Sequence, residues 1–168
     1  MDFDAQRFDT RAKLVGAELP ALEKASKFSE KLLSDYKKLL DKKFSKDPPE
    51  GLEEADVVLL GSIAREEGSS RSDCDYYVLQ KGAPPSTTRK LIMAMEEIPD
   101  VSERRKPGAQ RVFGEIVVAA NLYESIGLEL DSNANMTRRI LLLSESKPVT
   151  KGVTHKIVFD NILSRYCA

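Results

Sequence analysis

The sequence predicts an α+β domain, and three parts of the chain carry that prediction. Apolar side chains recur every three or four residues over 21–44, which is typical of an amphipathic helix. Two short apolar runs, at 55–60 and 76–79, have the length and composition of buried strands. A second amphipathic run covers 153–166. A long N-terminal helix and a C-terminal helix are therefore expected on either side of a small sheet.

Length and composition limit the class of protein. A chain of 168 residues with 41% hydrophobic and 32% charged residues is long enough for one ordinary domain with a core. The formal net charge of -1 gives no overall attraction to nucleic acid or to an anionic membrane. Two cysteines and one histidine do not support a structural zinc site or a disulfide framework. Without a signal segment or a long apolar run, we expect a cytoplasmic protein that does not bind membranes; the oligomeric state is not indicated.

The first predicted helix begins after Pro20, a residue suited to the first turn of a helix. Lysines and acidic residues alternate between its apolar positions, which favours a packing helix with a solvated face over a nucleic-acid-binding surface. A linker at 45–51 ends it. We expect three parts: an N-terminal helical segment at 1–50, a core at 51–147 and a C-terminal helix at 148–168.

Further elements follow the second strand. A helix is predicted at 86–97, and 102–111 forms a basic loop that either is ordinary surface or grips a phosphate-bearing partner. A third strand is predicted at 112–118 and a short helix at 122–126. A polar turn at 131–135 is expected to cap an apolar helix that begins near Met136 and is closed by Pro148.

Asp73 and Asp75 stand at the entrance to the second strand. Side chains two residues apart on a strand point to the same face, with Cα atoms roughly 6 to 7 Å apart. Both carboxylates can then reach one divalent cation, and hard oxygen ligands favour Mg²⁺ or Mn²⁺. Without a cation the two would repel each other, and one would tend to hold a proton. Cys74, between them, is expected to point into the core.

The turn after the first strand offers donors for phosphate. Gly61 allows a sharp turn and a close approach of the backbone to a ligand, and Ser62 adds a hydroxyl. Arg65 and Arg71 are close enough in sequence to neutralise phosphate charge. We therefore expect a triphosphate and its metal to bind between this turn and the two aspartates.

These residues resemble a known signature. Residues 61–75 read Gly-Ser-x-Ala-Arg-x-x-Gly-Ser-x-x-Ser-Asp-x-Asp, which is similar to the DNA polymerase β-like nucleotidyltransferase superfamily, especially its minimal bacterial members and larger bacterial proteins related to them. Phe113-Gly114 and a second run at 131–146 resemble further features of the larger group. The resemblance covers about residues 55–166. Glu66 departs from it, since a glycine is common at that position.

The resemblance implies a small mixed β-sheet backed by helices, and metal-dependent transfer of a nucleoside monophosphate from a triphosphate, with ATP the expected nucleotide, to a protein, nucleic-acid or small-molecule acceptor. It assigns nucleotide binding to Gly61, Ser62, Arg65 and Ser72, and metal binding and catalysis to Asp73 and Asp75. A third carboxylate commonly completes such a site, and the sequence leaves Glu115 and Asp131 both open. The alternative is a nucleotide-binding regulator or antitoxin-like partner that acts through protein association.

Overall fold

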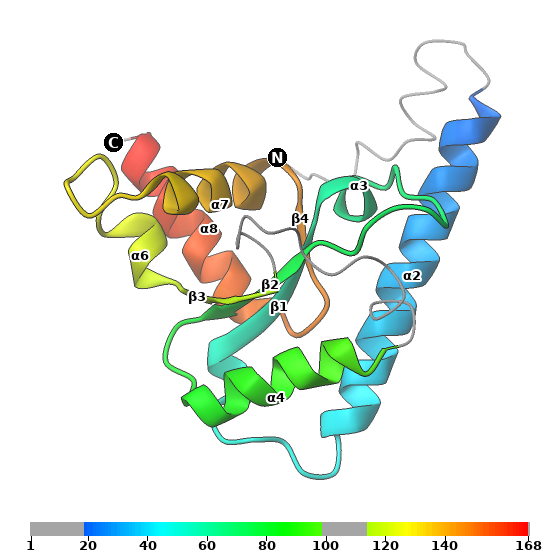
Figure 1. The fold of residues 1–168 in the computed structure, drawn as a ribbon, viewed down its shortest axis with the longest axis horizontal. Coiled ribbons are helices and arrows are strands. Elements are labelled where there is room, and N and C mark those ends of the chain that lie inside the picture. Colours follow the sequence, from blue (N-terminus) through cyan, green and yellow to red (C-terminus); the bar gives the residue numbers. More distant parts are fainter. Residues whose placement is uncertain (1–18, 99–113, 168) are drawn as a thin grey trace.

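A computed structural model describes residues 19–98 and 114–167 of the chain. Its centre is a four-stranded mixed sheet in the order β3-β2-β1-β4 (Figure 1). The strands are β1 (Ala55–Leu60), β2 (Tyr76–Gln80), β3 (Ile116–Val118) and β4 (Ser146–Pro148). The β1 strand is antiparallel to both β2 and β4, whereas β2 and β3 run parallel. All six residues of β1 are buried, as the apolar run predicts for a central strand.

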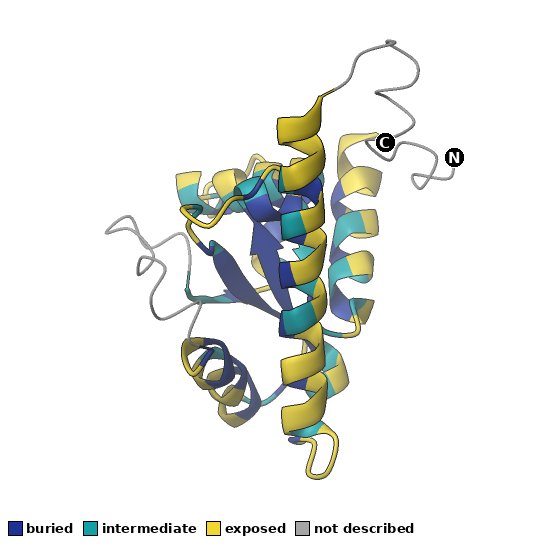
Figure 2. Ribbon diagram, turned by 90° about the vertical axis from the view of Figure 1, so that its right-hand side faces the viewer, coloured by how far each residue is buried: buried dark blue, intermediate teal, exposed yellow. Residues whose placement is uncertain are grey.

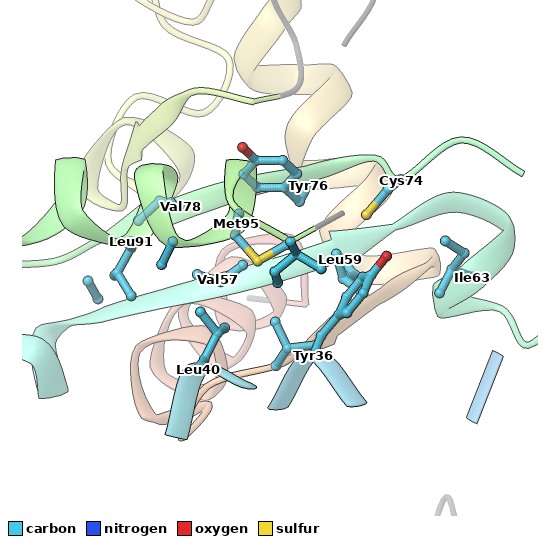
Figure 3. Close-up of a cluster of buried hydrophobic side chains, with 14 of the residues drawn as sticks. Tyr36, Leu40, Val57, Leu59, Ile63, Cys74, Tyr76, Val78, Leu91 and Met95 are labelled. Atoms are coloured by element: carbon cyan, nitrogen blue, oxygen red, sulfur yellow. The ribbon is translucent and has the colours of Figure 1, made fainter. Parts of the chain in front are cut away.

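Two long helices cover one face of the sheet. They are α2 (Pro20–Phe44) and α4 (Pro85–Glu96). One side of α2 is buried and its opposite side is exposed, as its sequence period predicts (Figure 2). Figure 3 shows the core on this face, where Tyr36 and Leu40 of α2 and Leu91 and Met95 of α4 pack around the sheet.

The other face carries three helices, α6 (Ala120–Tyr123), α7 (Asn133–Ser144) and α8 (Val153–Tyr166) (Figure 1). They enclose a second apolar cluster. Short helical turns, η2 (Leu52–Glu54) and α3 (Gly61–Ala64), flank β1. The predicted α+β class, with a small mixed sheet, a long N-terminal helix and a C-terminal helix, is confirmed. Within the described ranges, no helix is both long and apolar enough to cross a membrane.

The region before Pro148 differs from the prediction. The sequence predicts an apolar helix as far as Pro148, but α7 ends at Ser144, and Ser146–Pro148 form β4 beside β1. This strand has no apolar alternation, because pairing with β1 stabilises it in place of burial of its own side chains. The α7 helix also begins earlier than predicted, at Asn133, where the Ser132 hydroxyl caps the Asn135 amide at 3.1 Å. The predicted basic loop at 102–111 lies outside the described residues.

A buried carboxylate joins β1 to α8. Asp56 lies in the central strand β1 and is only 1% exposed, although its side chain is a carboxylate. Its side chain accepts hydrogen bonds from the amides of Gly152 at 2.8 Å and His155 at 2.9 Å, and from the Thr150 hydroxyl. It therefore satisfies the free amides at the start of α8 in the way that a capping residue does.

Candidate functional site

The turn after β1 places Gly61 beside one of the two aspartates. Gly61 begins α3 with φ +68°, a left-handed conformation that favours glycine. A β-carbon added at Gly61 would lie 3.4 Å from Oδ2 of Asp75. The turn and the carboxylate, 14 positions apart in the sequence, thus lie side by side, with room between them for little more than one methyl group.

The two aspartates lie just before β2, which begins at Tyr76. The Leu60 amide donates to the Asp75 carbonyl at 2.9 Å, so the hydrogen bonding between β1 and β2 continues to this residue. Asp73 is exposed, Cys74 is buried and Asp75 is half-buried. Cys74 points into the core beside Leu59, as predicted (Figure 3).

The two carboxylates interact electrostatically. Burial raises the pKa of Asp75, and the negative charge of Asp73 raises this pKa further. The charge of Asp73 is therefore near enough to Asp75 to disfavour ionisation of its carboxylate. A cation held between them would relieve that repulsion.

The other predicted phosphate ligands, Ser62, Ser72 and Arg65, differ in how far their side chains are already bonded to other residues. The Ser62 side chain is half-buried, and its hydroxyl makes no hydrogen bond to another residue of the described ranges. The Ser72 hydroxyl accepts a hydrogen bond from the Ser69 amide at 2.9 Å, so it shapes the loop before the aspartates. Arg65 pairs with Glu67 at 2.9 Å and also with Glu145. A phosphate would have to compete with these two carboxylates for the Arg65 guanidinium.

The structure separates the two candidates for a third carboxylate. Val78 pairs with Ile116, so Glu115 lies opposite Tyr77 and two positions from Asp75 along the neighbouring strand. Alternation along β2 and β3 puts Glu115 and Asp75 on the same face, with Cα atoms roughly 8 Å apart. The Glu115 carboxylate pairs with Arg138 at 3.0 Å.

Asp131 is engaged elsewhere. Both of its oxygens accept from the Arg139 guanidinium, at 2.8 and 2.6 Å, and one also accepts from the Gly127 amide at 2.9 Å. These hydrogen bonds, first those from Arg139, hold the pKa of Asp131 below its usual range. This bidentate pair joins Asp131, just before α7, to the middle of that helix. Because the register of β2 and β3 places Glu115 on the same face as Asp75, the geometry favours Glu115 over Asp131 as a companion of the two aspartates.

The residues that are present suit a cation shared with a phosphate ligand. No group of three or more His, Cys, Asp and Glu side chains in the described ranges is arranged to hold a metal ion. Mg²⁺ is commonly bound through one or two carboxylates together with substrate phosphates. Asp73 and Asp75, with the pKa of Asp75 raised by its neighbour, fit that role.

Two side chains near the site were not assigned a role from the sequence. Arg138 is nearly buried and faces Glu115, whereas the adjacent Arg139 turns to Asp131. Glu66 has φ +64°, the left-handed conformation that glycine adopts readily. Its position in the motif, where glycine is common, is a sequence signal for this backbone conformation.

Comparison with known proteins does not assign the chain to a family. No family model matches the chain, and no curated protein matches it.

Proposed function

We propose that this chain is a nucleotidyltransferase, which transfers a nucleoside monophosphate from a triphosphate, with ATP the expected donor, to an acceptor hydroxyl, and releases pyrophosphate. The observation that carries the proposal is that Gly61 lies beside the Asp75 carboxylate, whose pKa the charge of Asp73 helps to raise. A turn suited to phosphate is thus next to carboxylates suited to a cation. The motif resemblance described above supports the same assignment.

The residues have distinct roles in this proposal. The main chain at Gly61 lets the triphosphate approach closely, and the Ser62 hydroxyl donates a hydrogen bond to it. Asp73 and Asp75 hold Mg²⁺ or Mn²⁺, with Glu115 on the same face of the sheet. When bound, the cation supplies positive charge at the reacting phosphate. The protein contributes orientation and charge.

Transfer of label from a triphosphate tests the proposal. The protein is incubated with each of the four ribonucleoside triphosphates, labelled at the α-phosphate, with Mg²⁺ or Mn²⁺. Candidate acceptors are the protein itself, other proteins, RNA and small hydroxyl compounds. We expect labelling that the double variant Asp73→Ala, Asp75→Ala abolishes and that Glu129→Gln, at an exposed carboxylate, preserves. Label transfer by the double variant at the wild-type rate would refute these roles.

A second candidate function is a nucleotide-binding regulator that does not transfer the nucleotide. It is favoured by the pairing of Glu115 with Arg138, which occupies the third carboxylate in the structure. In that case the protein binds a triphosphate with Mg²⁺ but labels none of these acceptors.

A further inference from the structure

The turn over Arg65–Gly68 connects the proposed phosphate site to two distant parts of the chain. It is joined to the preceding turn by hydrogen bonds from the Glu67 amide to the Ser62 carbonyl, at 2.8 Å, and from the Glu66 amide to the Ile63 carbonyl, at 3.1 Å. A displacement of the Arg65–Gly68 turn would therefore displace Ser62 as well.

Side chains from α2 and β4 fasten this turn. The Glu66 carboxylate accepts from the Ser26 hydroxyl of α2 at 3.2 Å and pairs with Lys147 of β4. The Gly68 amide donates to the Ser29 hydroxyl at 2.9 Å, and Ser29 in turn donates to the Ala25 carbonyl. Three segments that are far apart in the sequence thus meet at one residue, Glu66.

The buried residues of α2 are polar where the helix meets the turn and apolar where it covers the sheet. The apolar ones are Leu32, Tyr36 and Leu40. The polar ones are Ser26 and Ser29, both buried, and they offer hydroxyls to the turn. Because buried hydroxyls need partners, these serines make the position of α2 depend on the position of the turn.

The backbone of Glu66 points to a reason for keeping a charged side chain there. At φ +64° a glycine would be free of the steric strain that a β-carbon introduces. Glutamate accepts that strain and gains contacts to Ser26 and Lys147, which a glycine could not make. The pairing with Lys147 also neutralises the negative charge of Glu66, which would otherwise repel the proposed triphosphate.

We propose that Glu66 is a positioning residue: through Ser26 and Lys147 it holds the Arg65–Gly68 turn, and with it Ser62, in the arrangement that binds the triphosphate. The affinity for nucleotide then depends on the docking of α2. This inference rests on the proposed function.

The test measures the binding of Mg²⁺ and α,β-methylene-ATP, a triphosphate analogue that resists transfer, by calorimetry. We expect Ser26→Ala to weaken binding about threefold and Glu66→Gly about tenfold, as fewer contacts hold the turn. The Gly68 amide should exchange its hydrogen faster in Glu66→Gly. Glu129→Gln should bind like the wild type. Ser26→Ala, a small change, gives a readout even if Glu66→Gly does not fold.

Charge reversal separates positioning from simple repulsion of phosphate by Glu66. We expect Glu66→Lys to weaken binding and the added change Lys147→Glu to restore most of the affinity, because the pair is rebuilt with opposite signs. Tighter binding by Glu66→Lys alone, or wild-type affinity in both Ser26→Ala and Glu66→Gly, would overturn the inference while leaving the proposed function standing. No binding by the wild type would instead overturn the proposed function, and this inference with it.

Discussion

Replacement of Asp75 by asparagine is expected to stabilise the metal-free protein while weakening its binding of Mg²⁺. The variant keeps the size and shape of the side chain but removes one of two negative charges. Since burial and the charge of Asp73 both raise the pKa of Asp75, the ionised carboxylate is unfavourable in the folded state. A residue that costs stability in the absence of its ligand is a common feature of binding sites.

The expected gain has two sources. Asparagine removes the penalty of burying an ionised carboxylate, which is the larger cause of the raised pKa, and it removes the repulsion by Asp73; together we expect them to contribute on the order of 1 kcal/mol. For a domain of this size that corresponds to a rise in melting temperature of about 2 to 4 °C. The magnitude is small, but its sign is opposite to that of most substitutions.

The pH dependence has a defined direction. Because the folded pKa of Asp75 is raised, its ionisation lowers the stability of the wild type as pH rises above the unfolded value, here 3.8. The penalty is complete above the folded pKa. The advantage of Asp75→Asn should therefore be absent below about pH 4 and present at pH 7.

Thermal unfolding by circular dichroism in EDTA, at both pH values, measures this effect, and calorimetric titration with Mg²⁺ measures the metal affinity. Glu129→Gln controls for the loss of one negative charge at an exposed position. A metal-free Asp75→Asn protein that melts below the wild type at pH 7, or one that binds Mg²⁺ with wild-type affinity, would refute the reasoning.

Three further substitutions test other parts of the structure. Asp56→Ala should lower the free energy of unfolding in urea by about 2 to 3 kcal/mol, since the amides at the start of α8 lose a buried acceptor, and an unchanged urea midpoint would contradict the capping role. Asp131→Asn should lower the melting temperature at pH 7 and should lower it progressively less as the pH falls below 3.8. The depressed pKa of Asp131 adds stability above its unfolded value, and this stability is lost as pH falls through the folded pKa; a loss that does not change with pH would contradict this. Gly61→Ala should weaken binding of Mg²⁺ and α,β-methylene-ATP in calorimetry. Gly127→Ala should not, because Gly127 has the same left-handed backbone but open space around it. Equal effects of the two variants on affinity would mean that backbone strain, and not the position of Gly61 beside Asp75, causes the loss.

The sequence predicts most of this fold because each main element has a local pattern of apolar residues. The α2 stripe and the apolar β1 and β2 runs each indicate their own conformation. The β4 strand could not be predicted in this way, since Ser146, Lys147 and Pro148 have no strand pattern and become a strand only by pairing with β1. A structure that depends on a partner distant in sequence leaves no local signal.

The candidate site also contains some features that a local sequence pattern predicts and others that depend on residues distant in the sequence. The proximity of Asp73 and Asp75 is expected from the two-residue period of an extended chain, and the charge of Asp73 helps to raise the pKa of Asp75. The partners of Arg65 and Asp131 do not follow from any spacing, because Glu145 and Arg139 reach them only in the folded chain. Asp56 did carry a signal: a single charge within an otherwise apolar strand implies a buried partner.

The central claim is that the Gly61–Ser62 turn and the Asp73–Asp75 pair form one metal-dependent triphosphate site. Calorimetric titration of α,β-methylene-ATP into the protein, with Mg²⁺ and then with EDTA, tests it most directly. We predict saturable binding by the wild type with Mg²⁺ only, and none by Asp73→Ala, Asp75→Ala. Absence of binding by the folded wild-type protein, or equal binding by the double variant, would contradict the claim.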